Sequence, residues 1–322
     1  MRKRNTRLSE PDQTAKLTQL ALLFILGSGW GLQFTLLKIA TDADLDEFGI
    51  VTVSMVLIAA FCLLAIAWRN AWFRPTRRHL RFFLIGGMFG FAAPLTAVVL
   101  AAEHLSAGLI VFCESLTPVL TLAIALAMRT EALTMLRVAA VALGMLGTAM
   151  VLWPELIMPE GGRTVGLLIG LTVPVAYAID GIYVAARWPR DLSPLQVVSG
   201  QVVAGAAVLL MLCYALGSPL PFALSPFGAV ASSGSWGAGE WAILAFVPVT
   251  CLLIFLYFHL LRRSGAVFVS AGSFISLFVG VFWGMALLGE QHSSSIWLAV
   301  VLVALALLLI NPRNVRQPAT AR

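Results

Sequence analysis

Two carboxylates stand inside long apolar stretches of the sequence. Glu114 lies within the stretch Ala107–Met128, and Asp180 lies within the stretch Val165–Ala186. If such a stretch crosses a membrane, a charge near its centre costs about 2.5–3.5 kcal/mol, so the residue usually faces a cavity or a partner. A carboxylate in a cavity can bind an amine or carry a proton. The alternatives are a protonated Glu114 that is hydrogen-bonded to a neighbouring helix, and an Asp180 that pairs with Arg187 or with water.

Polar and aromatic side chains near these carboxylates are candidates for a substrate site. Tyr177 and Tyr183 lie three residues on either side of Asp180, so in a helix all three would share a face. Polar residues in membrane helices also serve helix packing, which is the alternative for each of them. The other candidates for binding a substrate or a coupling ion are Trp30, Gln33, Thr117, Gln201 and Ser273.

Prolines inside the apolar stretches predict breaks in helices. Proline has no backbone N–H, so the carbonyl four residues earlier loses its usual donor. Pro118 would free a carbonyl close to Glu114, and that carbonyl could serve as a ligand. Such breaks are common in membrane helices, so an architectural role is as plausible as a role in gating. The candidates for helix breaks are Pro94, Pro118, Pro174 and Pro248.

Composition places these residues in a membrane protein. Of the 322 residues, 60% are hydrophobic and 11% are charged, whereas soluble domains carry about 25% charged residues. The basic residues lie in short segments between apolar stretches, so the net charge of +6 does not indicate a nucleic-acid partner. The sequence contains neither a GxxxxGK[ST] phosphate-binding loop nor an HExxH motif, and its four cysteines are isolated in apolar stretches. We therefore expect no enzyme activity, no cofactor and no metal site.

The elements that must position the two carboxylates are membrane-spanning helices. A span needs about 20 apolar residues, and the backbone in lipid must satisfy its own hydrogen bonds, which favours helices. All basic residues except Lys38 and Arg163 fall on one side if every stretch crosses, which predicts that both termini are cytoplasmic. The ten predicted spans are Leu17–Ala40, Phe48–Trp68, Leu80–Ala102, Ala107–Met128, Met135–Trp153, Val165–Ala186, Leu195–Leu216, Trp241–Leu261, Gly265–Leu288 and Ser295–Ile310.

The two halves of the chain resemble each other. The stretch from Leu105, LSAGLIVFCESLTPVLTLAIALAMRTE, parallels the stretch from Ser264, SGAVFVSAGSFISLFVGVFWGMALLGE, and both end in Glu. Each half has five predicted spans, so the second half would enter the membrane from the opposite side. Inverted repeats of this kind are typical of secondary transporters. We expect an all-α polytopic protein with a basic cytoplasmic tail at 1–16, five-helix repeats at 17–153 and 164–310, and a cytoplasmic tail at 311–322.

The sequence resembles the EamA-type members of the drug/metabolite transporter superfamily. The resemblance rests on SAGLIVFCESLTPVLTLAIALAMRTEALTMLRVAAVALGMLGTAMVL, on LLRRSGAVFVSAGSFISLFVGVFWGMALLGE and on the helix-1 pattern GSGWG, and it covers roughly Leu17 to Ile310. It implies ten helices, with the fifth and tenth at the periphery, around a central cavity. The chain departs from the family at Val-Ser-Met55, where an Arg is common, and at Phe274-Ile-Ser276-Leu277, where a proline step is common.

The resemblance also implies a function. Family members carry out secondary transport, often export, of amino acids or related metabolites. We expect alternating access in a bacterial cytoplasmic (inner) membrane, with a small-molecule substrate and lipid as partners and protons as a candidate coupling ion. The few basic residues within the spans suit an amine or amino acid better than a phosphorylated metabolite. The alternative is a non-transporting membrane receptor or scaffold, and a homodimer is left open.

Overall fold

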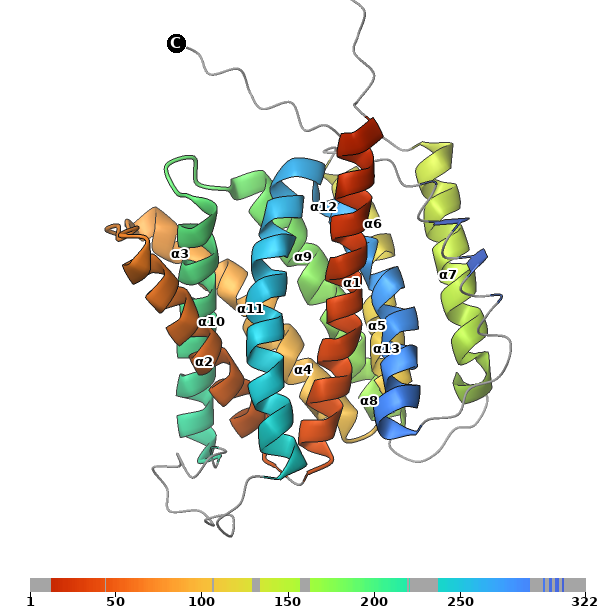
Figure 1. Ribbon diagram of the computed structural model, residues 1–322, viewed down its shortest axis with the longest axis horizontal. Coiled ribbons are helices and arrows are strands. Elements are labelled where there is room, and N and C mark those ends of the chain that lie inside the picture. The colour runs from red at the N-terminus through yellow and green to blue at the C-terminus, as the bar shows by residue number, and fades with distance from the viewer. Residues whose placement is uncertain are drawn as a thin grey trace, which may run out of the picture.

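The computed structural model describes residues 13–43, 45–105, 107–128, 134–156, 163–218, 220 and 237–289, together with 298, 301–302, 305–306 and 309. Over these residues the fold is helical and contains no strand (Figure 1). The elements are α1 (Gln13–Thr41), α2 (Glu47–Trp68), α3 (Arg77–Gly87), the π-helix η1 (Met88–Ala92), α4 (Ala93–Ala102), α5 (Ala107–Ser115), α6 (Thr117–Ala127), α7 (Met135–Leu156), α8 (Arg163–Gly170), α9 (Thr172–Arg187), α10 (Pro194–Leu216), α11 (Ala238–Ser264), α12 (Ala266–Ser270) and α13 (Gly272–Leu288).

Eight helical stretches in the described part of the chain are long and apolar enough to cross a membrane. They coincide, within a few residues at each end, with eight of the ten predicted spans. The fifth predicted span corresponds to α7, which contains the apolar helical stretch Val138–Gly147. The tenth predicted span falls mostly outside the described residues, as do both tails, Glu131 and Glu290. The chain is therefore an integral, multi-pass membrane protein.

Four of the spans are interrupted, and three of the interruptions precede a proline. Pro94 and Pro118 lie in the first turn of α4 and α6, and Pro174 lies near the start of α9. Helix α11, by contrast, continues through Pro248, so no break occurs at that candidate. The fourth interruption separates α12 from α13 at Ala271 and involves no proline.

A hydroxyl group caps the backbone at three of these interruptions. Thr117 donates to the carbonyl of Glu114, Thr172 to the carbonyl of Ile169 and Ser273 to the carbonyl of Ser270, over distances of 2.5, 2.6 and 2.8 Å. In each case the donor lies three residues after the acceptor, directly past the break. Unpaired carbonyls are costly in a membrane, so these hydroxyls make the breaks tolerable.

The helices before residue 157 pack mainly against those after residue 162. Helix α1 contacts α11 and α13, α2 and α3 contact α10, α5 contacts α13, and α6 and α4 contact α9. Figure 1 shows α1 and α11 side by side in the bundle, while α7 stands at its edge and contacts α5 and α13. The space enclosed by α1, α9, α11 and α13 is therefore lined by residues from both halves of the chain.

Glycines bring α1 and α13 into backbone contact. A Cβ atom on Gly31 would lie 2.6 Å from both the amide nitrogen of Gly280 and the carbonyl oxygen of Ser276. A Cβ atom on Gly27 would lie 2.5 Å from the carbonyl oxygen of Gly272. Small residues of this kind allow membrane helices to approach closely, because van der Waals packing is a main source of helix association in lipid.

This contact predicts unequal effects for two glycine substitutions in one interface. Gly31→Ala should lower the free energy of unfolding by about 1–3 kcal/mol, because its methyl group meets backbone atoms that cannot rotate away. Gly280→Ala should have a smaller effect, because its nearest new contact is a side-chain atom of Val111 at 3.4 Å. Thermal unfolding of the purified variants in detergent would measure the difference, and equal midpoints would contradict the packing described.

Candidate functional site

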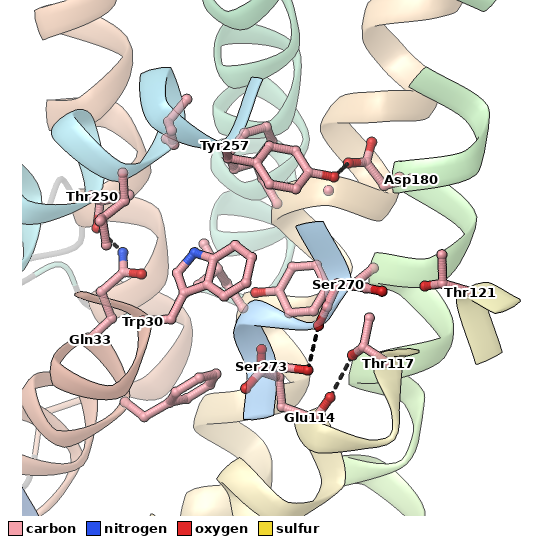
Figure 2. Close-up of a pocket in the computed structure, with 18 of the residues that line it drawn as sticks. Trp30, Gln33, Glu114, Thr117, Thr121, Asp180, Thr250, Tyr257, Ser270 and Ser273 are labelled. Atoms are coloured by element: carbon pink, nitrogen blue, oxygen red, sulfur yellow. Dashed lines mark hydrogen bonds between the residues drawn. The ribbon is translucent and has the colours of Figure 1, made fainter. Parts of the chain in front are cut away.

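A central cavity of about 110 Å³ lies among helices from both halves of the chain. Figure 2 shows its polar side chains, which converge from α1, α5, α6, α9, α11, α12 and α13. Among the residues that line it, none is Lys, Arg or His. They are Trp30, Gln33, Phe34, Leu37, Gly90, Phe91, Leu95, Glu114, Thr117, Thr121, Tyr177, Asp180, Gly181, Phe246, Thr250, Leu253, Ile254, Tyr257, Ala266, Ser270 and Ser273.

Glu114 reaches the cavity from the last turn of α5, and it is only 3% exposed. Its Oε2 accepts a hydrogen bond from the hydroxyl of Ser276 on α13, over 2.6 Å. The same hydroxyl oxygen lies 3.0 Å from the carbonyl oxygen of Ser273. A hydroxyl has one proton, so Ser276 can donate to the carboxylate or to the carbonyl, but not to both fully. If Glu114 were protonated, it could donate to Ser276 while Ser276 donates to Ser273.

The break after Glu114 gives its backbone a partner of its own. Helix α5 ends at Ser115 and α6 begins at Thr117. Pro118 has no N–H to donate to the carbonyl of Glu114, four residues earlier. The hydroxyl of Thr117 donates to that carbonyl instead (Figure 2). The carbonyl that the sequence suggested as a ligand is therefore already satisfied within the protein.

Asp180 lies on α9 and is also 3% exposed. Its partner is the hydroxyl of Tyr257 on α11, which donates to Oδ2 over 3.3 Å (Figure 2). Arg187, the partner considered from the sequence, makes no ion pair with it in the described residues, because the two lie almost two helical turns apart along α9. The second oxygen of Asp180, Oδ1, is buried and has no hydrogen-bond partner among the described residues.

Aromatic and amide groups complete the wall on the α1 and α11 side. The rings of Trp30 and Tyr257 have centroids 6.1 Å apart and are inclined at 52°. Gln33 donates through Nε2 to the hydroxyl of Thr250, which in turn donates to the carbonyl of Phe246 over 2.7 Å. These bonds join α1 to α11 beside the cavity (Figure 2).

The structure brings together most of the candidates named from the sequence. Trp30, Gln33, Glu114, Thr117, Tyr177, Asp180 and Ser273 all line the cavity, although they come from distant parts of the chain. Two candidates lie elsewhere. The ring of Tyr183 stacks on Phe82, with centroids 5.5 Å apart. Gln201 is buried against Gly86 of α3, and its side-chain amide has no hydrogen-bond partner.

Sequence reasoning missed Thr121, Thr250 and Tyr257, which also line the cavity. On α11 the cavity residues Phe246, Thr250, Ile254 and Tyr257 recur at helical spacing. A tyrosine and a threonine on one face of an otherwise apolar span were the available signal.

The break in the fourth span yields a stability prediction for Thr117. Replacing it with the similarly shaped Val would leave the buried carbonyl of Glu114 without a donor, at a cost of about 1–3 kcal/mol. Thr117→Ser keeps the hydroxyl and should retain most of the stability. Thermal unfolding in detergent would compare the two variants, and a Thr117→Val protein as stable as Thr117→Ser would show that the carbonyl finds another donor.

Three comparisons relate the chain to known proteins. Residues 17–153 match the model of the EamA-like transporter family. The whole fold is similar to that of a protein of known crystal structure, with a TM-score of 0.70 over 91% of this chain and 97% of that chain. The two sequences are 18% identical, so this likeness concerns the fold alone. No curated protein matches the chain.

The family assignment agrees with an all-helical, multi-pass architecture built around a cavity. EamA-like proteins are membrane transporters, which fits a chain whose polar side chains gather inside the bundle. Residues 17–153 are thus similar to the EamA-like transporter family, which is part of the drug/metabolite transporter superfamily.

Proposed function

We propose that the protein is a secondary-active exporter of amino acids or related small metabolites that works by alternating access. The observation that carries the proposal is the central cavity, which is lined from both halves of the chain and contains two buried carboxylates. Binding sites of secondary transporters lie between two repeats near the middle of the membrane. The proposed location is the cytoplasmic membrane of a bacterium, with both termini inside.

The pattern of helix contacts supports an inverted repeat over 17–153 and 164–310. Helix α1, the first span, packs against α11 and α13, which belong to the eighth and ninth spans. Helix α9, in the sixth span, packs against α4 and α6, which belong to the third and fourth spans. Exchanging each of these six spans for the one five places along the chain thus reproduces the same contacts. Two halves related in this way could exchange their conformations, which would open the cavity to each side in turn.

The surroundings of Glu114 support protons as the coupling ion. Ser276 faces two acceptors, the carboxylate of Glu114 and the carbonyl of Ser273, but carries a single proton. With Glu114 protonated, the carboxyl group, the Ser276 hydroxyl and the Ser273 carbonyl would each have a hydrogen-bond partner. Loss of that proton would draw the Ser276 hydroxyl towards Glu114 and away from Ser273. The protonation state of Glu114 would therefore change a contact between α5 and α13, one from each half.

A proton-gradient experiment on Glu114 tests this proposal. Liposomes that contain the wild-type protein, under an imposed pH gradient, should accumulate labelled amino acids or amines. Glu114→Gln cannot exchange a proton, so it should lose the gradient-driven part of uptake but retain exchange of labelled for unlabelled substrate. Glu103→Gln, at an exposed position between α4 and α5, is the matched control and should behave as wild type.

The outcomes separate the alternatives. Gradient-driven uptake that survives Glu114→Gln would leave a transporter but place proton coupling elsewhere. An absence of both uptake and exchange for amino acids, amines and other metabolites would contradict the transporter proposal and favour a receptor or scaffold.

A further inference from the structure

The ionisable side chains of opposite sign are not balanced in the cavity, because its charged lining residues are all acidic. Two carboxyl groups line it, whereas none of its lining residues carries a basic side chain. No Lys, Arg or His nitrogen lies within 4.0 Å of either carboxyl group in the part of the chain that the structure describes. Each carboxyl group accepts a hydrogen bond from a neutral hydroxyl, Glu114 from Ser276 and Asp180 from Tyr257. A buried carboxylate is stabilised either by protonation or by a nearby cation, so a positively charged ligand would provide the cation that the lining residues lack.

Asp180 is the better placed of the two to receive that charge. One of its oxygens accepts a hydrogen bond from Tyr257, while Oδ1 is buried and has no donor in the part of the chain that the structure describes. An unsatisfied buried acceptor is costly, and an ammonium group has several protons to donate to it. The carboxylate is also closely held, because a Cβ atom on Gly90 would lie 2.8–3.0 Å from its atoms. The backbone of η1 thus packs directly against the acid.

Aromatic rings beside Asp180 suit the same ligand. Tyr257, which holds the carboxylate, is next to Trp30, and Tyr177 lies one turn before Asp180 and also lines the cavity. Faces of such rings attract cations, and the attraction grows when water is excluded. A second charge of opposite sign on the ligand has no such partner. A free carboxylate in this cavity would face two acids and no basic side chain.

We propose that the cavity selects small amines with a net positive charge, holding the ammonium group at Asp180 beside Tyr257 and Trp30, and discriminates against zwitterions and anions. The inference rests on the proposed transport function, because it names the substrate class of that same cavity. Of the substrates proposed above, it excludes free amino acids and retains related metabolites that carry an amine but no free carboxylate, such as the amine, ester or amide counterparts of amino acids.

Direct binding to the purified full-length protein tests the charge rule without requiring transport. Isothermal titration would compare an amino-acid methyl ester, the free amino acid and its N-acetyl derivative, which are cationic, zwitterionic and anionic. Alanine, leucine and phenylalanine series would separate charge from size. In at least one series the ester should bind about tenfold or more tightly than the free amino acid, since close charge pairs contribute energies of this order. The N-acetyl derivative should not bind detectably.

Variants assign the effect to Asp180. Asp180→Asn should abolish the preference for the ester, while Asp191→Asn, an exposed aspartate between α9 and α10, should keep it. If Asp180→Asn fails to fold, Tyr257→Phe serves as the second variant. It removes the hydroxyl that donates to Asp180, so the carboxylate should depend more on the ligand and the preference for the ester should increase. An unchanged preference in Tyr257→Phe would contradict the assignment to Asp180.

The binding results can be told apart from a failure of the transport proposal. Free amino acids that bind as tightly as their esters in every series, or an absence of ester binding in all three series, would overturn the cation rule. A preference for the ester that persists in Asp180→Asn would overturn the assignment to Asp180. Ester binding in a protein that shows neither uptake nor exchange would uphold this site and contradict the transporter proposal instead.

Discussion

The structure depends on one constraint: a backbone within a membrane must find its hydrogen bonds inside the protein. The chain departs from regular helix in four spans, and three of these departures border the cavity, at η1, at Leu116 and at Ala271. At Leu116 and Ala271, a hydroxyl three residues after the acceptor satisfies a carbonyl next to the break. Irregular backbone thus occurs where local hydroxyls or the cavity itself accommodate it, and these interruptions turn Glu114, Gly90 and Ser270 towards a common space.

The second constraint is charge. Glu114 and Asp180 come from opposite halves of the chain and reach the same cavity, each with one neutral hydroxyl donor from another helix. Because neither has a basic neighbour in the described part of the chain, their compensation must come from protons or from a ligand. This requirement links the proposed proton coupling and the proposed substrate charge to one property of the protein, the lack of basic residues around the cavity.

Hydropathy predicted eight spans well, because the length and polarity of each are local properties. It also drew attention to Glu114 and Asp180, since a carboxylate within a span carries a large free-energy cost unless it faces a cavity or a partner. It did not predict Tyr257, because a tyrosine in a span also suits packing or the membrane interface. Tyr183 was grouped with Asp180 on spacing alone, yet it stacks on Phe82. Gln201 packs against Gly86, and such a contact depends on how α10 and α3 cross, which spacing within one helix cannot specify.

The hydroxyl caps at Thr117, Thr172 and Ser273 each bind a carbonyl of their own span. None of these bonds has to break when one span moves relative to another, so the interruptions can act as hinges at little enthalpic cost. The polar bonds that do join different spans around the cavity are Ser276–Glu114, Tyr257–Asp180 and Gln33–Thr250. These three bonds hold neighbouring spans together, and a substrate or proton in the cavity can reach them. Of the three bonds, Ser276–Glu114 and Gln33–Thr250 join the two halves of the chain, whereas Tyr257–Asp180 joins two spans of the second half. A ligand or proton that replaced the first two would release the halves from one arrangement.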